Sequence, residues 1–122
     1  MNEFELPPIR PVVWVGTSKK NLQGFPKGAQ KLIGDELQLI QYGEMPTNTK
    51  PFKGIGSGVF EIAIRYATDA YRAVLAVQLG EKIYVLHSFQ KKAKKGIATP
   101  KMDVDLIRQR YNEAKELAKH GQ

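Results

Sequence analysis

The sequence contains no cysteine among its 122 residues. This absence excludes disulfides, thiolate metal sites and cysteine nucleophiles, and it suits a protein of the reducing cytoplasm. Long hydrophobic runs are also missing, since no stretch approaches the roughly 20 apolar residues that span a bilayer. The acidic, proline-containing N-terminal segment has no apolar signal core. The sequence therefore predicts a cytoplasmic protein with no membrane partner.

Recognisable catalytic motifs are scarce as well. The sequence shows no metal-ligand spacing, phosphate-binding loop or hydrolase elbow, so no metal and no cofactor is expected. Asp103 and Asp105 lie in the first turn of a predicted helix, where the helix dipole favours carboxylates in any case. They are therefore weak candidates for a pair of catalytic acids.

Acidic residues are outnumbered, with 12 Asp plus Glu against 19 Lys plus Arg and a formal net charge of +7. A surplus of this size on a small chain favours a polyanionic partner such as RNA, DNA, an anionic membrane or an acidic protein. The alternative is a basic surface that serves solubility only. The length and a 42% hydrophobic content allow one compact domain.

The pattern of apolar residues and turn residues predicts an α+β fold. Residues 1–11 are expected to be a flexible leader because Pro7, Pro8 and Pro11 prevent a regular element, and residues 12–122 a single domain. The fold would contain an N-terminal helical hairpin, an antiparallel sheet of about four strands and a C-terminal helix. The expected elements are a strand at 12–15, helices at 18–25 and 26–43, a short strand near Phe52, strands at 60–66, 71–79 and 82–91, and a helix after Pro100.

The expected strand register predicts one polar sheet face. If residues 67–70 form the first connection, Arg65 faces Arg72 across the strands. If Gly80 and Glu81 form the second turn, Arg72 also faces Phe89, and Val74 faces His87. The opposite, apolar face would be covered by helices. It would carry Phe60, Ile62, Ile64, Leu75, Val77, Leu79, Tyr84 and Leu86, and the polar face would be left free.

The polar face is a candidate anion site. Two opposed arginines repel each other, but a phosphate between them would bind both guanidinium groups. Phe89 in the same row is suited to stack on a nucleobase, and His87 is a candidate general base because its reference pKa lies near neutrality. Two alternatives stay open. Glu61 neutralises one arginine on an ordinary solvated face, or His87 only lines the face.

A run of lysines follows the last predicted strand. Lys91, Lys92, Lys94 and Lys95 provide four positive charges within five positions, and Lys101 follows after the turn. Such a run would engage phosphates without reading base sequence. The alternative is a solvated loop, but the run begins at the strand end nearest Arg65 and Arg72.

Several segments resemble a known protein group. They are Trp14-Val15-Gly16, Phe52-Lys53-Gly54, Tyr71-Arg72-Ala73-Val74 and, most specific of all, the stretch from Leu86 to Pro100. From about Val12 to Tyr111 the chain resembles the phage-derived Gp49-like, HigB-related branch of the RelE/ParE toxin superfamily. The resemblance implies a RelE-like fold and the toxin of a type II toxin–antitoxin pair. Its partners would be a cognate helix-turn-helix antitoxin, mRNA and the ribosome.

The resemblance also implies roles for individual residues. Arg65 and Arg72 would match basic active-site strand residues, and Lys91 and Lys92 the basic strand end. Many of these ribonucleases place a catalytic tyrosine or histidine near the C-terminus, but Tyr111 here belongs to a helical apolar stripe. The expected sites are catalytic Arg65, Arg72, His87 and Lys91, and RNA-binding Lys53, Phe89, Lys92, Lys94 and Lys95.

The expected activity is cleavage of mRNA by attack of a ribose 2′-OH on the adjacent phosphate. Two other functions remain open because fold alone does not settle function. ParE-like relatives inhibit DNA gyrase by binding and need no catalytic residues. A non-catalytic member of a DNA-binding repressor complex is the third possibility.

Overall fold

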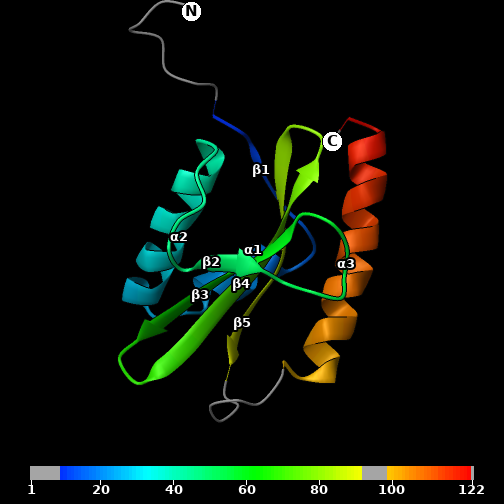
Figure 1. The fold of residues 1–122 in the computed structure, drawn as a ribbon. Coiled ribbons are helices and arrows are strands. Elements are labelled where there is room, and N and C mark those ends of the chain that lie inside the picture. The colour runs from blue at the N-terminus through cyan, green and yellow to red at the C-terminus, as the bar shows by residue number, and fades with distance from the viewer. Residues whose placement is uncertain (1–8, 92–98, 122) are drawn as a thin grey trace, which may run out of the picture.

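The computed structural model describes residues 9–91 and 99–121 of the chain. Its α+β architecture is shown in Figure 1, where one sheet lies between helices. The elements in chain order are β1 (Val12–Trp14), α1 (Ser18–Gln23), α2 (Lys27–Gln41), β2 (Thr49–Pro51), β3 (Val59–Tyr66), β4 (Asp69–Leu79), β5 (Lys82–Lys91) and α3 (Lys101–Lys119).

The sheet has five strands in the order β1-β5-β4-β3-β2. The pairs β2–β3, β3–β4 and β4–β5 are antiparallel, whereas β1 runs parallel to β5. The predicted antiparallel sheet of about four strands is thus corrected to a mixed sheet. The three-residue β1 is too short for an alternating pattern that would reveal its partner. Its pairing is made by long-range backbone bonds, among them Val15 N–H to the Val85 carbonyl at 2.9 Å.

Both faces of the sheet are covered, with α2 on one side and α3 on the other (Figure 1). The prediction that the polar face is free is therefore wrong, because α3 packs on part of it. A register shift between Val74 and Leu75 interrupts the alternation. As a result Tyr84 and Leu86, predicted for the other face, join the apolar cluster under α3. Such a bulge leaves little trace in the sequence.

The two N-terminal helices form close to their predicted ranges, but the helical hairpin is not confirmed. Helix α1 packs against β5, whereas α2 packs on β3 and β4. Thr17 occupies the N-cap position of α1. The buried hydroxyl of Ser18, the next residue, donates a hydrogen bond to the Val85 carbonyl at 3.0 Å. Helix α1 is therefore fastened to the sheet at its first turn.

The N-terminal segment is described from Ile9 onward, and residues 1–8 of the predicted leader lie outside the described residues. The guanidinium of Arg10 donates to the backbone carbonyls of Val77, Glu81 and Lys82. These bonds hold residue 10 against the β4–β5 end of the sheet. Within the described ranges, no helix has both the length and the apolar character that crossing a membrane requires.

Candidate functional site

The turn between β3 and β4 determines which basic residues meet on the sheet. Tyr66 pairs with Asp69, so the turn contains two residues, and Arg65 faces Ala70 while Ala63 faces Arg72. The predicted pairing of Arg65 with Arg72 is therefore wrong by two positions. Because side chains alternate with a period of two, this error leaves both arginines on the same face. The predicted pairs of Arg72 with Phe89 and Val74 with His87 are confirmed.

Three cationic residues lie next to Ala70 on the face of the sheet that α3 partly covers. Ala70 pairs with Arg65 on one side and with Lys91 on the other, and Arg72 lies two residues further along β4 on the same face. We call Arg65, Arg72 and Lys91 the cationic cluster. The short side chain of Ala70 separates the longer ones. The cluster therefore gathers cationic residues at neighbouring positions of one face, which suits an anion.

The carboxylate of Glu61, which lies opposite Val74 on the same face, reduces the charge of this cluster. Arg72 donates to Glu61 Oε1 at 2.7 Å, with 16% and 7% of the two side chains exposed, and Lys50 Nζ lies 3.7 Å from the same oxygen. The alternative that Glu61 neutralises one arginine therefore holds for Arg72. Arg65 is exposed and Lys91 is half-buried, and neither forms an ion pair with a residue that the structure describes. These two carry the free charge of the cluster.

His87 is buried beneath the first turn of α3. Its Nε2 lies 2.8 Å from Asp103 Oδ1, and its ring stacks on Phe89 with centroids 4.9 Å apart and planes 14° apart. Burial lowers the pKa of His87 below its ordinary value, although the hydrogen bond to Asp103 opposes that shift. His87 is therefore neutral at neutral pH. Its Nδ1 atom is buried and has no hydrogen-bond partner among the residues that the structure describes.

Asp103 is a site residue that sequence reasoning set aside as an ordinary first-turn carboxylate. Its side chain is 26% exposed, against 5% for His87. One signal was available in the helical spacing. Asp103 lies four residues before the fully buried Ile107, and residues four apart share a helix face. That spacing places Asp103 on the face of α3 that meets the sheet.

A pocket of about 450 Å³ lies along β5, between α1 and the first turn of α3. We call it the β5-edge pocket. It is bordered by aromatic, amide and carboxylate side chains together with buried polar groups. Its lining residues are Asn21, Gly24, Phe25, His87, Ser88, Phe89, Gln90 and Asp103.

Of the remaining predicted RNA-binding residues, the structure describes Lys53. Lys53 is exposed in the loop between β2 and β3, outside the rows that hold the cationic cluster. Lys92, Lys94 and Lys95 lie outside the described residues. In the described part of the chain, no group of three His, Cys, Asp or Glu side chains is placed to hold a metal ion.

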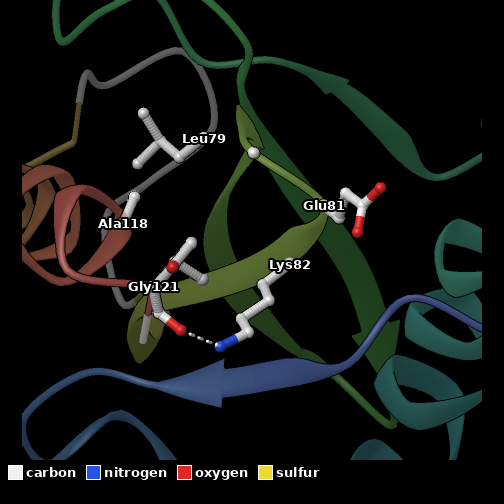
Figure 2. Close-up of a pocket in the computed structure, with 7 residues that line it drawn as sticks. Leu79, Glu81, Lys82, Ala118 and Gly121 are labelled. Atoms are coloured by element: carbon white, nitrogen blue, oxygen red, sulfur yellow. Dashed lines mark hydrogen bonds between the residues drawn. The ribbon is translucent and has the colours of Figure 1, made fainter.

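A second pocket lies at the opposite end of α3, by the β4–β5 turn (Figure 2). There Lys82 Nζ donates to the Gly121 carbonyl at 2.8 Å, while the side chain of Glu81 points away. Leu79 and Ala118 supply an apolar wall. This hydrogen bond links the segment just after α3 to β5. The ammonium group of Lys82 in this pocket therefore already has a partner.

Comparison with known proteins places the chain in a family. Residues 20–112 match the family model described as "Phage derived protein Gp49-like (DUF891)". A search of the curated proteins found no match. The matched segment runs from α1 into α3, so it includes the cationic cluster and the β5-edge pocket and spans well over half of the chain. The chain therefore belongs to the Gp49-like family of phage-derived proteins.

Proposed function

We propose that this protein is the toxin of a type II toxin–antitoxin pair and that it cleaves mRNA. The observation that carries the proposal is the cationic cluster, in which Arg65, Arg72 and Lys91 lie next to the small Ala70 on one face of the sheet. Guanidinium and ammonium groups gathered on one surface suit a phosphate of the RNA backbone. Membership of the Gp49-like family and the net charge of +7 support the same reading.

In the proposed reaction the ribose 2′-oxygen attacks the adjacent phosphorus and the bond to the 5′-oxygen breaks. The products are a 2′,3′-cyclic phosphate and a 5′-hydroxyl. The cationic cluster stabilises the additional negative charge of the transition state. Neutral His87 accepts the 2′-hydroxyl proton once substrate binding uncovers Nδ1, and Lys91 gives a proton to the leaving 5′-oxygen.

The proposed partners follow from the same surface. An acidic segment of a helix-turn-helix antitoxin would neutralise the cationic cluster, and the ribosome would present the mRNA. Attraction between opposite charges makes association with such partners fast and dependent on salt.

A second candidate is non-catalytic inhibition of DNA gyrase, as in ParE-like proteins. Two observations favour it. Glu61 already neutralises Arg72 at 2.7 Å, and the Nδ1 atom of His87 is buried. Both features reduce catalytic power, which an inhibitor that acts by binding does not need.

Brief induction in cells without the antitoxin tests these functions. We expect growth arrest and new transcript ends at discrete mRNA positions. DNA damage without mRNA cuts would favour gyrase inhibition, and neither effect from soluble protein would favour a repressor subunit.

Matched variants connect that result to the cluster. We expect Arg65→Ala to reduce mRNA cutting about a hundredfold, the usual effect of losing a transition-state contact. Lys119→Ala removes the same charge at the far end of α3 and should cut normally. Equal cutting by both variants would place the active site elsewhere.

A further inference from the structure

The β5-edge pocket combines the side chains that recognise nucleobases. Phe25 and Phe89 supply aromatic surface, and Asn21 and Gln90 carry amides that both donate and accept hydrogen bonds. Asp103 adds a carboxylate, which accepts only. The pocket, of about 450 Å³, is widely open to solvent, so a base can enter it without displacing a covering segment of the described chain. The pocket therefore offers stacking together with polar groups that can read the edge of a base.

Two buried polar atoms in the lining residues have no hydrogen-bond partner in the described part of the chain. They are Oγ of Ser88 and Nδ1 of His87, and the two residues are only 1% and 4% exposed. Buried polar groups in native proteins are nearly always satisfied by protein, water or ligand. Both residues line the β5-edge pocket, and as successive residues of β5 they point to opposite faces of the sheet.

The pocket adjoins the cationic cluster. Phe89 lines the pocket and also pairs across the strands with Arg72. Neighbouring strands are about 4.8 Å apart, so Phe89 lies about one strand spacing from Arg72. A nucleotide bound in the pocket would thus present its phosphate toward the cluster.

We propose that the β5-edge pocket binds a nucleobase, and that guanine is the base it prefers. This inference rests on the proposed function for its substrate class. One oxygen of Asp103 is held by His87 Nε2 at 2.8 Å, which orients the carboxylate. Its other oxygen and remaining lone pairs accept hydrogen bonds from a ligand. Guanine presents two adjacent N–H donors, at N1 and N2, whereas uracil presents carbonyl oxygens beside its single donor.

NMR titration of the full chain with GMP, AMP, CMP, UMP and inorganic phosphate tests the pocket directly. We expect GMP to bind about tenfold more tightly than the other nucleotides, as a matched polar pair usually discriminates. The backbone amide signals of Asn21, Phe89 and Asp103 should shift with GMP. Equal affinity for all four nucleotides, or the same shifts with inorganic phosphate, would overturn the proposal.

The variant Asp103→Asn tests the role assigned to the carboxylate. Asparagine keeps an acceptor for His87 Nε2 but replaces a ligand acceptor by a donor, so the tenfold preference for GMP should vanish while the fold remains. Asp105→Asn is the matched control, because Asp105 is exposed and pairs with Lys101 on the same helical turn. Retention of the preference by Asp103→Asn would contradict the proposal.

Mapping the bases at the RNA cut sites separates this inference from the proposed function. Selective GMP binding without RNA cleavage would leave the pocket standing and remove the ribonuclease. RNA cleavage without guanine preference, together with unselective nucleotide binding, would remove the pocket and leave the ribonuclease.

Discussion

At the scale of single residues, Arg72 has two roles that the sequence did not separate. Its guanidinium belongs to the cationic cluster, and it also holds the buried carboxylate of Glu61 at 2.7 Å. Removal of Arg72 leaves Glu61, which is 5% exposed, with Lys50 at 3.7 Å as its remaining charged partner among the described residues.

We therefore predict that Arg72→Ala lowers the free energy of unfolding by about 1–3 kcal/mol, the usual cost of leaving a buried polar group unpaired. Chemical denaturation of the purified chain measures the change. The double variant Arg72→Ala with Glu61→Ala should recover part of the loss, since it removes the unpaired carboxylate as well. Equal stability of Arg72→Ala and the wild type would contradict this account of Glu61.

His87 should make stability depend on pH. Its pKa in the folded chain lies below the ordinary value of 6.5, mainly because burial disfavours the charged imidazolium. As pH falls below about 6.5, the unfolded chain takes up a proton that the folded chain does not bind. Stability is therefore complete above that pH and declines until the lower pKa of the folded state is reached. Chemical denaturation at several pH values between about 8 and about 5 measures this loss of stability.

The variant His87→Gln isolates this contribution. Its stability should vary less over the same interval, because the group that titrates is absent. His120→Gln is the matched control, since it removes the second of the two histidines, which is exposed. A similar decline in His87→Gln would assign the effect to other groups.

At the scale of elements, the β3–β4 turn sets the register of the candidate site. Its first central residue, Ala67, has a φ of 56°, in the left-handed region that costs a non-glycine residue roughly 1–2 kcal/mol. Thr68, the second central residue, has no positive φ. A two-residue turn with positive φ only at its first position favours glycine there.

We predict that Ala67→Gly raises the free energy of unfolding by about 0.5–1 kcal/mol, because relief of strain exceeds the added flexibility of the unfolded chain. Thr68→Gly should instead lower stability, since that position needs no positive φ. Thermal denaturation of both variants provides the comparison. A loss of stability in Ala67→Gly would show that the turn is not strained.

At the scale of the whole molecule, the net charge of +7 governs how the protein meets a nucleic acid. Each phosphate contact releases counterions, so the logarithm of RNA affinity should fall linearly with the logarithm of salt concentration. We predict that Arg65→Ala makes this slope shallower by about 0.7, the contribution of one phosphate contact on a single strand.

Fluorescence anisotropy with a labelled single-stranded RNA at several salt concentrations measures the slope. Lys119→Ala is the matched control, because it removes the same charge from the far end of α3. Its slope should equal that of the wild type. Equal slopes for Arg65→Ala and the wild type would mean that RNA does not contact the cationic cluster through Arg65.

The sequence by itself determined the features that depend on local interactions. Apolar periodicity and Gly80 predicted the β4–β5 hairpin. In the structure Gly80 has a positive φ of 73°, and β5 occupies the expected range from Lys82 to Lys91. The order of the larger elements and the shared face of Arg72, Phe89 and His87 follow from the same local rules. The family could also be identified from the sequence, because each of its motifs is a contiguous stretch of the chain.

Only the tertiary structure decided the features that join distant segments. The parallel pairing of β1 with β5, the bulge between Val74 and Leu75 and the covering of the polar face by α3 depend on packing between elements. Asp103 reaches His87 across 16 positions of sequence because Ile107 is buried against the sheet. Local propensity does not encode such contacts, since their energies arise only when the elements pack together.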